Sequence, residues 1–131
     1  MKYNFEGEED LTTCETLIMK TIWDAGGEIP FMDLQKLLKE KFEKDYSRTT
    51  VATFLLKLSD KGYVENYRKG RNSYTRALKS EDVYKKKLLQ KETEFWFSKN
   101  PANMISALCK CQRLTKEEAD EIRSILDGLD Y

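Results

Sequence analysis

Residues 47–62 have the sequence SRTTVATFLLKLSDKG, which predicts the central helix of the chain. Four apolar side chains recur at i, i+3, i+4 and i+7 and therefore share one helix face: Val51, Phe54, Leu55 and Leu58. Ser47 is suited to cap the start of the helix, and Gly62 can supply a left-handed residue after its end. This pattern predicts a helix with one face packed against a core.

The N-terminal end of this helix carries short hydroxyl side chains beside one cation. These residues are Arg48, Thr49, Thr50 and Thr53, and no carboxylate lies among them. Hydroxyls can bond to base edges or phosphates, and a guanidinium can bind guanine or phosphate, so the set suits a DNA-reading helix. An ordinary amphipathic helix with a polar outer face is the alternative that this stretch alone leaves open.

Two short strands are predicted directly after this helix. Residues 63–68 and 73–78 alternate between apolar and polar side chains, and the turn between them, at 69–72, holds a glycine and two cations. A helix followed at once by a basic hairpin is the layout of a winged helix-turn-helix, in which the helix enters the major groove and the wing contacts the neighbouring backbone.

The charge of the chain is concentrated in this segment. The formal net charge of all 131 residues is zero, but residues 44–79 hold nine Lys or Arg against three Asp or Glu. Such a basic segment is typical of a nucleic-acid binder. A winged helix that binds a protein partner is the alternative, although that function does not require this concentration of charge.

The rest of the chain completes a fold that is mostly α with a small β-wing. We expect a flexible acidic tail at 1–10, a winged helix-turn-helix DNA-binding domain at 11–79 and a C-terminal helical dimerisation domain at 80–131. Thr12 and Glu15 form a predicted capping box for a first helix that ends near Asp24, and a second helix is expected at 32–42.

Three further helices are expected in residues 80–131, the first of them ending near Lys99, and they have too few partners within the chain for an independent core. Their apolar faces predict a two-fold homodimer in which each copy covers the other. The residues expected at this interface are Leu88, Phe95, Met104, Ile105, Leu108, Ile122 and Leu126.

Several other classes of protein are excluded by the composition. The chain has no histidine, no Gly-rich phosphate loop and no G-x-S-x-G motif, so we do not expect an enzyme. It has no apolar run long enough to span a membrane and no signal peptide, so we expect a cytoplasmic protein without membrane insertion. The three cysteines do not indicate a disulfide framework.

Motifs spread along nearly the whole chain resemble those of the penicillinase repressor family, the BlaI/MecI-type bacterial repressors. The matching stretches are LTTCET…IMKTIW in 11–23, YSRTTVAT in 46–53, LSDKGYV in 58–64, RKGR with a following Tyr in 68–74, and LT to IL in 114–126. Each motif alone is loose, but their order and spacing together are fairly specific.

This resemblance implies a dimeric winged-helix repressor that binds palindromic double-stranded operator DNA ahead of resistance genes, such as a β-lactamase gene. In well-known members a membrane sensor-protease detects β-lactam and the repressor is then cleaved, so the resemblance also implies such a partner. The residues expected to contact DNA are Ser47, Arg48, Thr49, Thr50, Thr53 and Lys57 in the helix and Arg68, Lys69 and Arg71 in the wing.

The chain departs from the family pattern at two places. Position 52 is Ala where well-known members carry a basic residue, so the base preference is expected to differ. The cleaved Asn-Phe pair of those members falls at about Ala107-Leu108, where this chain has a different pair.

The Cys-x-Cys pair at Cys109 and Cys111 is a candidate site for a soft metal such as copper(I) or zinc. Copper-responsive relatives carry two such pairs at the C-terminus, which makes a metal-responsive repressor the alternative. This chain has one pair, and it precedes the last helix, so we expect no metal and no cofactor.

Overall fold

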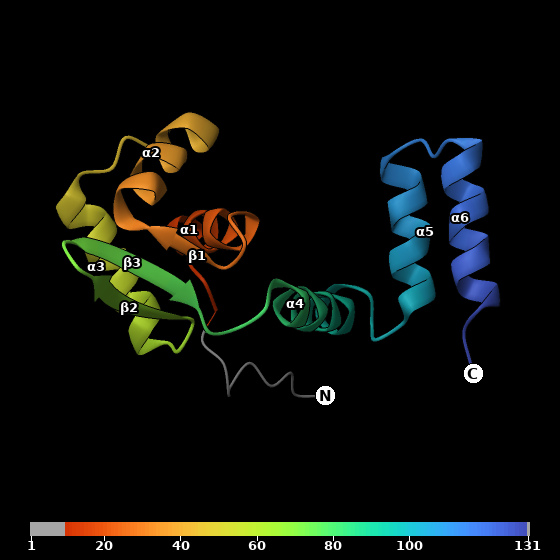
Figure 1. Cartoon of the computed structure of the whole chain (residues 1–131). Helices are drawn as coiled ribbons and strands as arrows, with labels where there is room; N and C mark the ends of the chain where they lie inside the picture. The colour runs from red at the N-terminus through yellow and green to blue at the C-terminus, as the bar shows by residue number, and fades with distance from the viewer. Residues whose placement is uncertain (1–9, 131) are drawn as a thin grey trace. The chain divides into compact units, whose positions relative to one another are not determined.

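The computed structural model describes residues 10–130, so the expected flexible acidic tail lies, apart from Asp10, outside the described residues. The chain divides into two compact units, with the boundary between Leu88 and Leu89. The described residues form six helices and a three-stranded antiparallel sheet, which is the mostly helical fold with a small β-wing that the sequence predicts (Figure 1).

The first unit is a winged helix. Its elements follow the order α1 (Thr13–Asp24), β1 (Glu28–Pro30), α2 (Phe31–Phe42), α3 (Arg48–Asp60), β2 (Val64–Lys69), β3 (Asn72–Ala77) and the first part of α4 (Glu81–Trp96). The strand order is β1-β3-β2, and β2 and β3 form the wing, a hairpin closed by Gly70 and Arg71.

The helix ends of this unit follow from local sequence. Thr12 and Glu15 form the predicted capping box of α1. Ser47 caps α3 by accepting a hydrogen bond from the Thr50 N–H over 3.1 Å. Gly62 follows α3 with a φ of 81°, a left-handed backbone conformation that residues other than glycine rarely adopt. The predicted central helix is therefore confirmed.

The core lies between α1, α2, α3 and the inner face of the sheet. Three of the four apolar residues predicted for the inner face of α3 are buried (Val51, Leu55 and Leu58), and Phe54 packs against them. The start of α4 is fixed to the same unit, since the Tyr84 ring lies 5.5 Å from that of Trp23. The indole of Trp23 also donates a hydrogen bond to the Lys79 carbonyl oxygen.

The second unit contains the end of α4 and the helices α5 (Pro101–Cys111) and α6 (Lys116–Asp127). Asn100 caps α5, and Thr115 forms a capping box with Glu118 at the start of α6. The prediction that the long helix reaches Lys99 is wrong. The helix ends at Trp96, and Ser98 and Lys99 adopt left-handed φ angles of 51° and 60°.

None of the residues of α4, α5 and α6 is fully buried. Within residues 10–130, no helix combines the length and the apolar character needed to cross a membrane.

Candidate nucleic-acid interface

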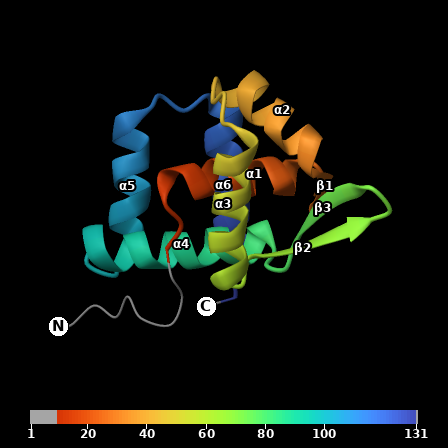
Figure 2. The same ribbon diagram turned by 90° about the vertical axis from the view of Figure 1, so that its left-hand side faces the viewer.

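The surface of α3 that faces away from the core is a ridge of three residues. Thr49, Thr53 and Leu56 follow one another at i, i+4 and i+7, and all three are exposed. We call them the outer ridge of α3. In Figure 2, α3 lies in front of α1 and no other element of the unit lies in front of it, so the exposed ridge is available to a groove of double-stranded DNA.

The hydroxyl groups at the start of α3 are held by local hydrogen bonds. The Ser47 hydroxyl donates to the Thr50 hydroxyl oxygen over 2.9 Å, so the Thr50 proton stays available for donation. The Thr53 hydroxyl donates to the Thr49 carbonyl oxygen over 2.9 Å, so its oxygen can only accept from a ligand. Thr50 therefore suits an acceptor such as guanine O6 or a phosphate, and Thr53 suits a base amino group.

Three of the predicted DNA-contacting arginines lie together where α3 meets the wing. Arg48, Arg68 and Arg71 line one hollow of about 270 Å³, together with residues from the start of α2 and from β3. We call them the arginine cluster. The Arg48 guanidinium packs 5.7 Å from the centre of the Phe31 ring, which holds it at the rim of this hollow. Guanidinium groups bind phosphate through paired hydrogen bonds, so the cluster can hold an anion.

The start of α2 belongs to this hollow too, and sequence reasoning missed it. Phe31, Met32 and Asp33 line the hollow beside the arginine cluster, so one carboxylate shares the hollow with the three guanidinium groups. Pro30 is the N-cap of α2, and its side chain makes no capping hydrogen bond to the first N–H groups of the helix. A helix N-terminus attracts phosphate through these groups and its dipole. The signal in the sequence is a proline at the position where a capping hydroxyl is usual.

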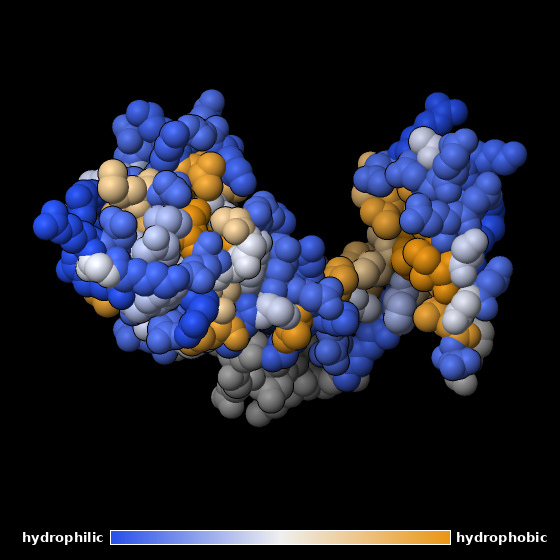
Figure 3. Space-filling model, in the orientation of Figure 1, coloured by the Kyte–Doolittle hydropathy of each residue, from blue (hydrophilic) through white to orange (hydrophobic). Residues whose placement is uncertain are grey.

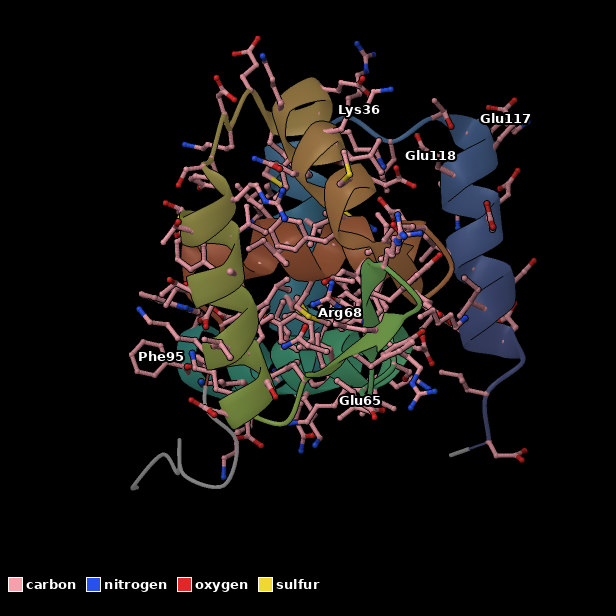
Figure 4. All side chains as sticks on the ribbon, turned by 60° about the vertical axis from the view of Figure 1, so that its left-hand side comes forward. Lys36, Glu65, Arg68, Phe95, Glu117 and Glu118 are labelled. Atoms are coloured by element: carbon pink, nitrogen blue, oxygen red, sulfur yellow. The ribbon has the colours of Figure 1, made fainter. Side chains whose placement is uncertain are left out.

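Lys69 does not join the arginine cluster. Side chains alternate along a strand, so Glu65, Tyr67 and Lys69 point to the face of β2 opposite to Arg68. Figure 4 labels Glu65 and Arg68, one on each side of the hairpin. The Lys69 ammonium lies 3.2 Å from a Glu28 carboxylate oxygen and 5.1 Å from the centre of the Tyr74 ring. Lys69 is therefore paired with a carboxylate on this face of the wing.

The outer face of the wing is a packed layer of rings and charges. The Tyr67 and Tyr74 rings stack with centres 5.9 Å apart, and Arg76 forms an ion pair with Glu65 across the strands. These contacts stiffen the hairpin on the side away from the arginine cluster.

Lys57 lies on the flank of α3, one turn after Thr53. Its side chain is exposed, and its ammonium lies 6.0 Å from the centre of the Phe54 ring. Ala52 lies on the other flank and is exposed as well. The two flanks thus differ, with a cation on one side of the outer ridge and a methyl group on the other.

The position of α3 is fixed at its C-terminal end by a buried ion pair. The Lys61 ammonium lies 2.7 Å from a carboxylate oxygen of Glu15, whose side chain is 1% exposed. Burial raises the pKa of Glu15, but the hydrogen bonds from Lys61 and Thr12 lower it by more, so the pKa lies below its ordinary value. The second carboxylate oxygen of Glu15 is buried, and no residue within 10–130 forms a hydrogen bond with it.

The residues predicted to form a dimer interface lie on α4, α5 and α6. Met104 and Ile122 are half-buried, and the other five are exposed: Leu88, Phe95, Ile105, Leu108 and Leu126. Further apolar side chains are exposed on the same helices, Trp96 and Ile125 among them. Figure 3 shows hydrophobic surface, in orange, on the unit that contains α5 and α6.

Cys109 and Cys111 are both exposed and lie in the last turn of α5. Side chains two residues apart on a helix point about 200° apart, so the two sulfurs cannot reach the same ion while this turn is helical. The Cys111 thiol donates to the Leu108 carbonyl oxygen. The described residues contain no group of three or more His, Cys, Asp or Glu side chains suited to a metal ion.

Comparison with known proteins gives one family and several similar structures. The family model described as penicillinase repressor matches residues 11–128. No curated protein sequence matches. The solution structure of the DNA-binding domain of the repressor BlaI is 25% identical, covers 60% of this chain and 94% of that chain, and has a TM-score of 0.49.

Two longer structures are similar as well. The complex structure of hsRosR-S4 is 12% identical, covers 91% of this chain and 89% of that chain, and has a TM-score of 0.50, which indicates a shared fold. Bordetella bronchiseptica BpsR, whose DNA binding is regulated by 6-hydroxynicotinic acid, is 13% identical with a TM-score of 0.47 and covers 92% of this chain and 78% of that chain.

Proposed function

Because the chain belongs to the penicillinase repressor family, whose model matches residues 11–128, we propose that it represses transcription by binding palindromic operator DNA as a homodimer. The family consists of DNA-binding transcriptional repressors and not of enzymes. The observation that most supports binding to operator DNA is the arginine cluster beside the outer ridge of α3. The cluster is a candidate phosphate site, and the ridge is a candidate base-reading surface.

The proposed mode of binding places the N-terminal half of α3, and the next turn as far as Leu56, in the major groove. Thr50 and the outer ridge then face base edges, while the arginine cluster and the first N–H groups of α2 hold the phosphates beside the groove. Phosphate contacts fix the register of the protein on DNA, and base contacts select the sequence. Repression is steric, because a bound dimer occupies DNA that the transcription machinery needs.

The proposed homodimer is supported by the exposed apolar residues of α4, α5 and α6. A helical unit with no fully buried residue gains a core when a second copy covers its apolar face. A two-fold dimer presents two copies of α3 to two half-sites, which accounts for a palindromic operator.

Family membership also suggests what is regulated. We propose that the chain acts in the cytoplasm, that its targets are resistance genes such as a β-lactamase gene, and that an inducing signal, such as one passed on by a membrane sensor-protease, releases it from DNA. The pair at Ala107-Leu108 does not match the cleaved pair of well-known members, so the proposal does not include cleavage at that bond.

The experiment that tests this function is enrichment of duplexes from a random DNA library by the full chain, followed by a reporter assay. We expect enrichment of a two-fold symmetric site and lower expression of a reporter placed behind that site when the chain is present. Enrichment of no sequence would contradict the repressor proposal, and enrichment of a site without symmetry would contradict the dimer.

A further inference from the structure

We propose that Leu56 is a specificity-determining residue that recognises the 5-methyl group of thymine in the major groove. This inference rests on the proposed function, since it assigns a base preference to the surface that is proposed to bind DNA. It starts from an exposed apolar side chain at the C-terminal end of the outer ridge of α3.

Leu56 is 63% exposed, although the unit to which it belongs has a well-packed core. Its neighbours Leu55 and Leu58 are both buried, so the position of Leu56 on the helix, and not a loose core, accounts for its exposure. It continues the outer ridge after Thr49 and Thr53. A single exposed leucine is common on protein surfaces, but this one lies on the face that is proposed to enter the groove.

Ala52 extends the apolar surface. It lies four residues before Leu56, so the two side chains are neighbours on the helix surface, and Ala52 is exposed too. Together they form an apolar strip beside the hydroxyl groups of the ridge threonines. No charged residue lies between them on this strip.

Thymine is the base that matches such a strip. In the major groove every base pair offers hydrogen-bonding groups, but only thymine offers a methyl group. An apolar side chain gains free energy by covering this methyl group and leaves the hydrogen-bonding groups of other bases without partners. Leu56 therefore favours thymine by contact and disfavours other bases by desolvation.

The spacing along α3 allows this contact. Thr49 and Leu56 are seven residues apart, which is about 10 Å along a helix and about three base-pair steps of DNA. The major groove is about 12 Å wide, so α3 can present both residues to the same half-site. The threonines then read one end of the half-site, and Leu56 reads a thymine about three base pairs away.

The test uses the duplex that the full chain enriches from a random library. Each thymine in it is replaced, one at a time, by deoxyuridine, which removes only the methyl group. We expect one position in each half-site at which this replacement weakens binding of the wild-type chain about fourfold, as burial of one methyl group implies. Leu56→Ala should bind the thymine and deoxyuridine duplexes equally well.

Thr53→Ala is the matched control, because it alters the same ridge but should keep the difference between thymine and deoxyuridine at that position. Since Leu56 is exposed, Leu56→Ala should unfold at the same denaturant concentration as the wild type. A wild-type chain that is insensitive to every replacement, or a Leu56→Ala chain that keeps the full sensitivity, would overturn this inference alone. A chain that enriches no duplex would overturn the proposed function and this inference together.

Discussion

The side-chain amide of Asn66, in the first strand of the wing, donates a hydrogen bond to the backbone carbonyl oxygen of Leu55, in the middle of α3, over 3.2 Å. The oxygen of the same amide accepts a hydrogen bond from the Thr75 hydroxyl over 2.9 Å. One side chain therefore joins both strands of the wing to α3. This link fixes the distance between the outer ridge and the arginine cluster.

Asn66→Ala should lower both the stability of the fold and the affinity for DNA. The substitution leaves the hydroxyl of Thr75, a residue that is 1% exposed, without its acceptor, which should cost about 1–3 kcal/mol in the free energy of unfolding. Binding should weaken on operator and scrambled DNA alike, because the wing loses its fixed position. Urea denaturation and a DNA titration measure the two effects.

Thr75→Val separates these effects. In the Asn66→Ala background it removes the unpaired hydroxyl, so the double variant should regain part of the stability and none of the DNA affinity. If Asn66→Ala binds DNA with wild-type affinity, the amide is not needed to hold the wing.

Arg68→Ala and Lys69→Ala should differ sharply although the two residues are adjacent. Arg68 belongs to the arginine cluster, whereas Lys69 lies on the opposite face beside Glu28. Arg68→Ala should weaken binding to all sequences and reduce the salt dependence of binding by about one unit of slope. Lys69→Ala should change neither quantity.

Arg48→Ala and Arg71→Ala should behave like Arg68→Ala, since all three guanidinium groups line one hollow. Titrations of labelled duplex at several salt concentrations measure the slopes. Equal losses of DNA affinity for Arg68→Ala and Lys69→Ala would show that both faces of the wing contribute equally to DNA binding.

The Glu15–Lys61 pair should make the fold sensitive to acid. The native pKa of Glu15 lies below its ordinary value of 4.5, so ionised Glu15 stabilises the fold above that pH. This contribution should disappear as the pH falls through the native pKa. Glu15→Gln should therefore show a shallower loss of stability in acid, as measured by denaturant unfolding between about pH 3 and pH 7.

Lys61→Met should have the opposite effect, because its stability relative to the wild type should improve as the pH falls. It leaves a buried carboxylate without its cation, which should cost about 3–5 kcal/mol at neutral pH. Burial then raises the pKa of Glu15, so the difference between the variant and the wild type should shrink in acid, where the carboxyl is neutral. A difference that stays constant with pH would mean that this pair does not control the acid response.

Ile105→Glu should separate the proposed dimer into monomers. Ile105 is an exposed apolar residue of α5, and a carboxylate there would be buried without a partner in a dimer interface. Sedimentation velocity should show a loss of dimer for Ile105→Glu and an unchanged dimer for Ser106→Glu, which adds the same charge about 100° away on the same helix. A wild-type chain that sediments as a monomer at micromolar concentration would contradict the proposal.

Local signals in the sequence predicted much of this fold. The apolar spacing within 47–62 and the caps at Thr12 and Ser47 depend on neighbouring residues, so they could be found without a structure. The end of α4 at Trp96 was missed, because the left-handed residues that follow it are Ser and Lys and not Gly.

The long-range features could not be found in this way. Lys61 pairs with Glu15 across 46 positions of sequence, and no local pattern shows that these two charges meet inside the protein. Lys69 and Arg68 point to opposite faces of the wing, because side chains alternate along β2. Which of the two faces the core is set by the packing of Val64 and Thr75 into it.

A titration of the wild-type chain against its own upstream DNA and against scrambled DNA of equal length, at several salt concentrations, tests the central claim most directly. The account predicts tighter binding to the upstream DNA, two chains per site, and an affinity that falls steeply as the salt concentration rises. Equal affinity for both duplexes, or no binding to either, would contradict the claim that α3 and the arginine cluster recognise an operator there.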